Sequence, residues 1–149
     1  MRISAKEDYA IRAALELARS DGIIVKRDEI AEAQGIPIAF LENILLLLKR
    51  GEIVETLRGP DGGIRLARPA AEISVADVVR AVAGPLAVVR GVRPPAIEYE
   101  PSAEPLREVW VALRANIRSV LERVTLADLA SGKLPAAITR ITRDPKAWE

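Results

Sequence analysis

The fold of this chain is decided by the segment KRDEIAEAQGIPIAFLENILLLLKR, residues 26 to 50. Apolar side chains recur there at helical spacing on both sides of a Gly-Ile-Pro turn. The spacing predicts one helix over 26–34 that ends at Gly35, and a second helix that has Pro37 in its first position and ends at Gly51. Two helices joined by such a tight turn form a helix-turn-helix by pattern. The pattern occurs in helical proteins of many kinds, so its meaning depends on what surrounds it.

A β-hairpin is predicted immediately after the second helix. The runs 53-IVETL-57 and 64-IRLA-67 alternate apolar and polar residues, and RGPDGG separates them with the residues that tight turns favour. The short run 23-IIV-25 is long enough only for a bridge or a stub strand. A hairpin that directly follows a helix-turn-helix makes a winged helix, and the two features together are much more specific than either alone.

The glycine-rich tip of this hairpin can be compared with the phosphate-binding loop of an enzyme. A Walker loop requires a lysine and a hydroxyl after its last glycine, with a strand before it and a helix after it. Here Ile64 follows Gly63, both flanks are strands, and no G-x-G-x-x-G occurs. The remaining alternatives are a plain hairpin tip with solvated arginines and a wing that faces DNA, and the neighbouring helix-turn-helix favours the wing.

Composition narrows the function classes further. The 149 residues suffice for one core or for one domain with an appendage, and half of them are apolar. The net charge of +1 gives no overall preference for nucleic acid, so any basic patch is local. Cysteine and histidine are absent, which excludes disulfides, cysteine nucleophiles, Ser-His-Asp triads and the usual zinc or iron–sulfur sites. No acid–base pair of carboxylates stands out, and we expect no enzyme.

The start of the chain predicts a helix and not a targeting segment. Ser4 and Glu7 have capping-box spacing, and the helix that follows them is predicted to end at Asp21-Gly22. The charged start MRISAKEDYA is unlike a signal peptide, and the longest apolar run, 44-ILLLL-48, is far too short for a membrane span. We therefore expect a cytoplasmic protein that contacts no membrane.

The remainder of the chain is predicted to be helical apart from one long loop. Ser74 and Asp77 have capping-box spacing before a helix that ends at Gly84. A mainly α fold with a small β-hairpin follows, in which a winged helix-turn-helix domain carries a long dimerisation helix over about 103–124. The predicted divisions are a DNA-binding domain at 1–84, a Pro-rich loop in the sensor position at 85–103, the dimerisation helix and a short C-terminal helix at 104–141, and a frayed tail at 142–149.

The long helix carries an apolar seam at heptad spacing. Its members are Leu106, Trp110, Leu113, Ile117, Val120 and Val124. Such a seam can pack on its own domain. Because the winged-helix unit is predicted to be a closed core without this helix, a second copy of the chain explains the seam better, and we predict a homodimer. Two recognition helices related by a two-fold axis then suit a pseudo-palindromic operator.

Three surfaces of the winged helix are candidates for contact with double-stranded DNA. The exposed first turns of the second helix of the motif are expected to face the major groove, where Glu42 can accept a hydrogen bond from cytosine N4 and Ala39 or Ile38 can meet a thymine methyl. Basic groups at the preceding helix and at the hairpin can meet phosphates or enter a minor groove. The predicted DNA-binding residues are Lys26, Arg27, Ile38, Ala39, Phe40, Glu42, Asn43, Arg58, Asp61, Gly62, Gly63 and Arg65.

Some of these assignments have an ordinary structural alternative. Glu42 can equally be an exposed first-turn glutamate that favours the helix dipole, and Phe40 can belong to the core or to the groove. Lys26 and Arg27 can form no more than a solvated helix terminus, and Arg68 at the base of the hairpin is expected to be structural. The wing glycines are expected to let the backbone approach a phosphate and to adopt positive φ.

These residues resemble the Rrf-type family of bacterial winged-helix regulators, which includes IscR, NsrR and CymR. SAKEDYAIRAALELA is similar to the family's first helix, IAEAQGIPIAFLENIL to its helix-turn-helix, and IVETLRGPDGGIRLARP to its wing, while ISVADVVRAVAGP and TLADLASG match in place. The resemblance implies a dimeric transcription factor whose long helices cross, with Glu42 as a base-reading glutamate and Arg58 as the wing arginine. Phe40 stands where the family often has tyrosine, and Ala39 where it often has a polar residue, so operator preference is expected to differ.

The loop before the long helix departs from the family pattern. Cluster-binding members hold an iron–sulfur cluster there with three cysteines, whereas 88-VVRGVRPPAIEYEPSAE-104 contains no cysteine and no histidine. Its Glu98, Glu100 and Glu104 are hard ligands that suit such clusters poorly. We expect no cofactor and no metal, with a possible small-molecule effector or protein partner as the signal. The expected function is a homodimeric repressor; the alternative is a protein-interaction module of the same fold that binds and regulates a partner enzyme.

Overall fold

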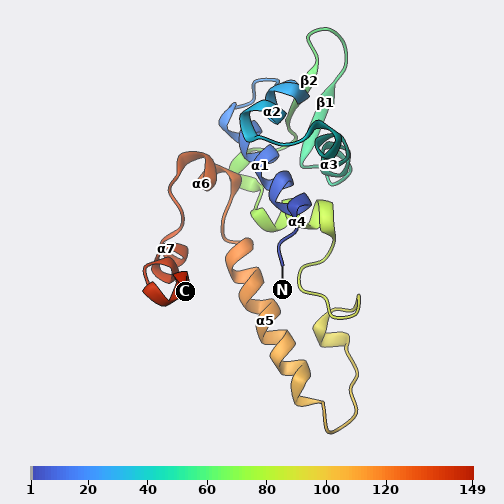
Figure 1. Cartoon of the computed structure of the whole chain (residues 1–149), viewed down its shortest axis with the longest axis vertical. Helices are drawn as coiled ribbons and strands as arrows, with labels where there is room; N and C mark the ends of the chain where they lie inside the picture. The colour runs from blue at the N-terminus through green and yellow to red at the C-terminus, as the bar shows by residue number, and fades with distance from the viewer. Residues whose placement is uncertain (1) are drawn as a thin grey trace.

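The computed structural model describes residues 2–149, and Figure 1 shows them as a winged-helix body from which one long helix projects. The helices are α1 (Ala5–Arg19), α2 (Arg27–Gln34), α3 (Ile38–Arg50), α4 (Val75–Ala83), α5 (Pro105–Leu121), α6 (Leu126–Ser131) and α7 (Ala136–Thr142), with 3-10 turns η1 (Ala70–Glu72), η2 (Pro94–Ala96) and η3 (Pro145–Trp148). The strands are β1 (Val54–Leu57) and β2 (Gly63–Leu66). The mainly α fold with one small hairpin confirms the fold class predicted from the sequence.

α1 lies at the centre of the winged-helix body because one side of it is lined with alanine. The predicted capping box is formed: the Ser4 hydroxyl accepts a hydrogen bond from the Glu7 amide, and the Ser4 amide donates one of 2.8 Å to the Glu7 carboxylate. Ala10, Ala13 and Ala14 are completely buried, and their small side chains let α2, α3 and α4 pack closely against α1.

The helix-turn-helix predicted over residues 26–50 is present. α2 ends at Gly35, whose left-handed backbone (φ 61°) is the conformation that glycine adopts without strain. α3 begins at Ile38, so Pro37 precedes the helix and does not occupy its first position. No single helix within residues 2–149 is long and apolar enough to cross a bilayer, and the one pair that passes that test together, α2 with α3, bends by 116° between its members.

The predicted hairpin is also present. β1 and β2 pair antiparallel in a register that places Val54 opposite Leu66 and Thr56 opposite Ile64. Val25, in the short run that was expected to form a bridge, exchanges two backbone hydrogen bonds of 2.8 Å with Ile64. This bridge attaches the hairpin to the start of α2, and Figure 1 shows the hairpin rising beside α2 and α3 as a wing.

The winged-helix body also includes a segment that the predicted division at residue 84 left out. The amide of Val75 donates a 2.8 Å hydrogen bond to the carbonyl of Val124, and the amide of Leu126 donates one of 2.9 Å to the carbonyl of Ile73. Leu126 is completely buried in the same core as α1. The chain therefore returns to the body after α5, and α6 helps to close a core that is incomplete at residue 84.

α5 stands apart from the body. It is shorter at both ends than the predicted helix over 103–124. None of its residues is buried. The loop that contains η2 runs beside it in Figure 1. Within the tail at 142–149 that was expected to be frayed, Pro145–Trp148 form η3, and the Trp148 indole donates a hydrogen bond of 2.7 Å to the carbonyl of Thr142. The helix α7, which the sequence analysis did not predict, ends where this tail begins.

Candidate nucleic-acid interface

α3 has one buried side and one open side. The buried residues are Leu41, Ile44, Leu45 and Leu48. The residues predicted to face the major groove are all exposed, and they are Ile38, Ala39, Phe40, Glu42 and Asn43. Leu46 is exposed as well and, at 100° per residue, lies on the same open side, although the sequence did not single it out. The open side of α3 thus presents one carboxylate, one amide and several apolar groups.

Phe40 belongs to the surface and not to the core. Its side chain is 58% exposed, and its ring lies 6.0 Å from the ring of Tyr9 in α1 at a tilted angle of 59°. The guanidinium of Arg12 lies 4.9 Å from the centre of the same Tyr9 ring. Phe40 is therefore supported on one side by α1 while the rest of the ring is open to solvent.

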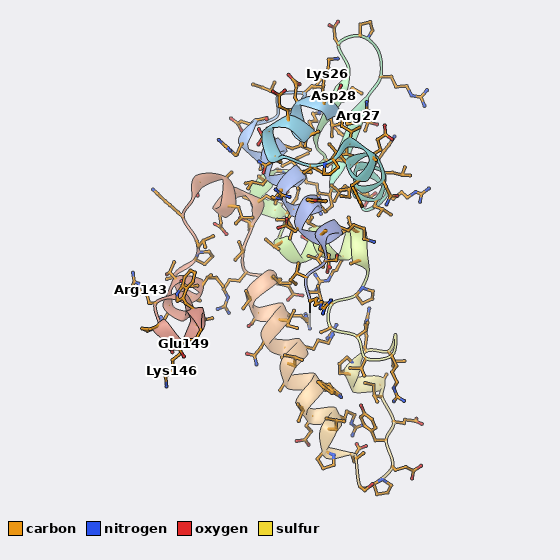
Figure 2. The ribbon with its side chains drawn as sticks, in the orientation of Figure 1. Lys26, Arg27, Asp28, Arg143, Lys146 and Glu149 are labelled. Atoms are coloured by element: carbon orange, nitrogen blue, oxygen red, sulfur yellow. The ribbon has the colours of Figure 1, made fainter. Side chains whose placement is uncertain are left out.

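Two of the predicted DNA-binding residues pair with each other. The guanidinium of Arg27 at the start of α2 forms an ion pair with the carboxylate of Glu42 in α3, and its Nε lies 3.2 Å from Asp28. Figure 2 shows Lys26, Arg27 and Asp28 together at the start of α2. The pair joins the two helices of the motif across their exposed ends. It also fixes the direction in which the Glu42 carboxylate is presented.

Lys26 is directed to the wing. Its ammonium group donates hydrogen bonds of 2.9 Å to the carbonyl of Pro60 and of 3.1 Å to the carbonyl of Gly62. These two carbonyls lie in the turn between β1 and β2. Lys26 therefore holds the wing tip against the start of α2, a role that the sequence did not indicate.

The wing presents one free arginine and one paired arginine. Arg58 is exposed, and within residues 2–149 it takes part in no ion pair. Arg65 pairs with Glu55, its cross-strand neighbour in the hairpin register. Asp61 is exposed in the turn. Of the two wing arginines predicted to meet DNA, Arg58 is the one whose guanidinium is available without breaking an ion pair.

The Gly62-Gly63 pair serves the wing's own packing. A Cβ on Gly62 would overlap the carbonyl of Leu57, and a Cβ on Gly63 would lie 2.7 Å from the carbonyl oxygen of Val25. Neither glycine has positive φ; within the turn that conformation belongs to Gly59, at 101°. The expectation of positive φ in the wing glycines therefore holds for Gly59 and is corrected for Gly62 and Gly63, which are required by the close approach of the hairpin to itself and to Val25.

The predicted dimerisation seam is only partly open. Leu106 and Leu113 are exposed, whereas Trp110 donates a hydrogen bond of 3.1 Å to the Tyr99 hydroxyl in the loop and Ile117 packs on buried residues of the body. Val124 lies beyond the end of α5 and is only 7% exposed, because it packs in its own chain's core. Val124 is therefore removed from the seam.

The open apolar stripe of α5 includes residues that the sequence analysis missed. It runs through Leu106, Val109, Leu113, Asn116 and Val120, again at alternating spacings of three and four residues. Val109 is 55% exposed, the most open of its apolar members. Both this set and the predicted set have spacings that alternate between three and four residues, so spacing alone does not distinguish them. Which set is open to solvent depends on where the loop and the body cover α5.

An apolar groove adjoins this stripe. Its volume is about 550 Å³, and it lies between the start of the chain, the end of α4 and α5. Ile3 and Val79 line it together with Asn116 and Val120, which also belong to the stripe. The stripe and the groove therefore form one continuous apolar surface.

The carboxylates of the loop in the sensor position do not gather into a metal site among residues 2–149. Within residues 2–149 no three His, Cys, Asp or Glu side chains gather as metal ligands. Glu104 forms an ion pair with Arg107, and Glu98 and Glu100 are exposed. With no cysteine and no histidine anywhere in the sequence, the donor atoms do not fit an iron–sulfur cluster.

A helix-turn-helix whose second helix is open on one side, followed by an attached hairpin with a free arginine, defines a winged helix-turn-helix protein. The sequence model of the Rrf2 family, described as an iron-dependent transcriptional regulator, matches residues 3–132, and the chain belongs to that family. It is 48% identical over 150 residues to Rv1287 of Mycobacterium tuberculosis, with 100% of this chain and 93% of that protein covered. Iron dependence, which the family description names, does not suit the side chains of this chain, because it has no cysteine and no histidine.

Solved structures carry the same fold. CymR, the global cysteine regulator of Bacillus subtilis, superposes with a TM-score of 0.73 at 30% identity, covering 88% of this chain and 97% of that one. IscR of T. potens superposes with a TM-score of 0.71 at 29% identity, covering 89% and 88%. The predicted resemblance to this family is thus confirmed in sequence and in fold.

Proposed function

We propose that this chain is a sequence-specific DNA-binding transcriptional regulator. It acts in the cytoplasm as a homodimer on a pseudo-palindromic operator, without an iron–sulfur cluster, and represses transcription. The observation that carries the proposal is the open side of α3 beside a wing that presents Arg58. In winged helices such a helix reads base edges in the major groove, while the hairpin meets the phosphates or the minor groove.

Glu42 is proposed to read a cytosine while Arg27 positions it. A carboxylate accepts a hydrogen bond from cytosine N4, and the ion pair with the Arg27 guanidinium limits the rotation of the Glu42 carboxylate. Arg27 also neutralises the charge of Glu42, which reduces the repulsion between that carboxylate and the DNA phosphates. Ile38 and Ala39 are suited to thymine methyl groups on the same side of α3.

The homodimer is proposed to form through the apolar stripe of α5 and the groove beside it. Large apolar residues at heptad spacing on an open helix are the surface that a second helix covers. The groove extends this surface to the end of α4, so the partner's α5 has both a helix and a body to contact. Asn116 lies within the stripe, where a polar side chain favours one register of the two helices.

Titration against duplex DNA tests the regulator proposal directly. Purified protein is mixed with random duplex DNA at two salt concentrations and with a fragment isolated from bound genomic sites. We expect binding that weakens steeply with salt and is tighter on the selected fragment. Absence of binding at low salt would reject the regulator and favour the alternative protein-interaction module.

Two substitutions separate base reading from phosphate contact. Glu42→Ala is expected to relax the base preference at one operator position by about tenfold, with nearly unchanged affinity for random DNA. Arg58→Ala is expected to lower the affinity for random and selected DNA alike. Equal effects of both variants on both DNA samples would contradict these roles.

Two valines of α5 provide a matched pair for the dimer. Val109 is 55% exposed and lies in the stripe, whereas Val111 is 39% exposed and lies outside it. Val109→Glu is expected to convert the dimer to a monomer in sedimentation experiments, because two carboxylates would be buried face to face. Val111→Glu is expected to leave the dimer intact. Dissociation by both variants, or by neither, would reject the stripe as the interface.

Transcription in vitro tests the direction of regulation. A promoter that overlaps a selected site is transcribed with and without the protein. We expect less transcript when the protein is present, since an occupied operator blocks access to the promoter. An increase would replace the repressor by an activator without affecting the DNA-binding proposal.

A further inference from the structure

Four arginines converge on one open cleft at the junction of α4, the loop and α5. The cleft has a volume of about 770 Å³, within the range of small-molecule sites. Arg80 comes from α4, Arg93 from the residue before η2, and Arg114 and Arg118 from α5. Segments that are far apart in the sequence thus place the same charged group around the same space.

Only part of this positive charge is neutralised by the chain. Glu122 forms an ion pair with Arg80 and receives hydrogen bonds of 2.9 and 3.3 Å from Nε and Nη2 of Arg118. These contacts with Arg118 first, and then with Arg80, lower the pKa of Glu122 to about 2, so its carboxylate is ionised near neutral pH. Asp77 lies 3.7 Å from Arg80. The acidic groups therefore serve the side of the cleft formed by Arg80 and Arg118.

The other side of the cleft has no acidic partner. Within residues 2–149, neither Arg93 nor Arg114 takes part in an ion pair. Arg114 donates from Nε to the carbonyl of Leu86 at 3.3 Å, a contact that orients its guanidinium and leaves the two terminal nitrogens free. Pro85, Leu86 and Ala96 supply apolar surface between the charged groups. This lining differs from that of an ordinary solvated surface, where opposite charges intersperse.

The arginines of the cleft lie away from the apolar stripe of α5, although Pro85 and Leu86 line both the cleft and the neighbouring groove. Arg118 comes nine residues after Val109, which is about two and a half helical turns, so the two lie on opposite sides of α5. A partner helix on the apolar stripe therefore leaves the arginine side of α5 accessible.

We propose that this cleft binds a small organic anion that carries two or more carboxylate or phosphate groups. Guanidinium groups form charge-assisted, often bidentate hydrogen bonds with such oxyanions, and Arg93 and Arg114 have donors to offer. The apolar residues accommodate the carbon part of the molecule. Resting on the proposed DNA-binding function, the cleft is the effector site: an anion held between the loop and α5, beside Arg80 of α4, changes the affinity of the protein for DNA.

Calorimetric titration of the full chain with inorganic pyrophosphate and with citrate tests the site in the absence of DNA. We expect saturable binding of one anion per chain. Binding of pyrophosphate alone would indicate a phosphorylated ligand, and binding of citrate alone would indicate a polycarboxylate. Binding of both would indicate a site that selects for charge. Binding of neither anion would overturn the proposal.

Three variants and one control locate the binding. Arg93→Gln and Arg114→Gln are each expected to weaken the binding about tenfold, the usual effect of losing one charged hydrogen bond. Glu122→Gln is expected to strengthen it, because Arg80 and Arg118 lose a competing carboxylate. Arg143→Gln removes an arginine near the C-terminus (Figure 2) that does not line the cleft, and it is expected to have no effect. Equal weakening by Arg143→Gln would indicate attraction to net charge and reject the cleft.

The regulatory part is tested by DNA affinity with and without saturating anion, at matched ionic strength. We expect the anion to change the affinity of the wild-type protein at least threefold and that of Arg114→Gln by much less. An anion that binds without changing DNA affinity would reject the effector role. Since calorimetry requires no DNA, failure of the anion site and failure of the DNA-binding function are distinguished.

Discussion

Lys26→Met separates a phosphate contact from a tether within the protein. The ammonium of Lys26 donates to two carbonyls of the wing turn, those of Pro60 and Gly62. Methionine retains the length of the side chain and loses both hydrogen bonds. If the lysine acts as a tether, the wing of the variant becomes free to sample positions that do not fit DNA. Binding to DNA must then bring the wing back to the position that fits, which costs free energy.

The size of the effect follows from these two hydrogen bonds. Exposed hydrogen bonds of this kind contribute about 0.5 kcal/mol each, hence about 1 kcal/mol per chain and about 2 kcal/mol per dimer. DNA affinity is therefore expected to fall by up to about 30-fold. The salt dependence is expected to stay unchanged, because no contact to a phosphate is lost. Arg58→Ala removes two proposed phosphate contacts per dimer and should reduce the slope of log affinity against log salt by about 1.8.

Fluorescence anisotropy with a labelled operator at four or more salt concentrations measures both quantities. Lys133→Met, which removes an exposed lysine near the C-terminus, is the control and is expected to match the wild type. A slope reduced by about 1.8 in Lys26→Met would refute the tether and assign Lys26 to a phosphate. An unchanged affinity would refute both roles.

The remaining predictions concern the core, the acidic limit of stability and the wing. Leu126→Ala should destabilise the chain by about 3 kcal/mol and lower Tm by about 6–12 °C at fixed protein concentration. Leu134→Ala, at an exposed position, should change Tm little. Similar effects of the two variants would contradict the packing of α6 in the core. The stability that Glu122 contributes should be constant above its ordinary pKa of 4.5 and disappear as the pH falls toward about 2, so urea unfolding of wild type and Glu122→Gln should converge only in that range; a difference that persists at about pH 2 would contradict its ion pairs. Gly63→Ala should loosen the bridge between Val25 and the wing and speed amide hydrogen exchange there, and unaltered exchange would contradict the close approach.

Local patterns in the sequence were sufficient to predict α1 to α6 and the wing, but not α7. These patterns act on residues close in the sequence, so their effect can be predicted from the sequence alone. They are the capping boxes at Ser4 and Ser74, the end of α2 at Gly35 and the turn residues between β1 and β2. The burial of Leu126 in the core could not be predicted in this way. Its burial depends on a return of the chain to Ile73, more than fifty residues earlier, and a short helix shows no preference for a distant core.

The candidate site was predicted in its residue types more than in their contacts. Exposure of the first turns of α3 follows from helical periodicity, and Ile38, Ala39, Glu42 and Asn43 are exposed. Periodicity left Phe40 open between core and groove. The partners of Lys26, Arg27 and Arg65 do not follow from periodicity, because a basic side chain at a helix start or in a hairpin finds its acceptor in three dimensions. Each of these three basic side chains finds an acceptor within the protein, whereas Arg58 takes part in no ion pair among residues 2–149.

The position of the arginine cleft gives it leverage over DNA binding. α5 touches the body near its C-terminal end, through Ile117 and Leu121 and through the ion pairs of Glu122, while its other end lies far from the body in Figure 1. Its 17 residues make a lever of about 25 Å, so a tilt of about 10° at the junction moves the far end by about 4 Å. In a dimer joined through α5, that motion changes the distance between two recognition helices that must match half-sites about 34 Å apart. An anion held at the junction acts where the smallest rotation produces the largest change in that spacing, which is why a site there can regulate DNA binding without touching DNA.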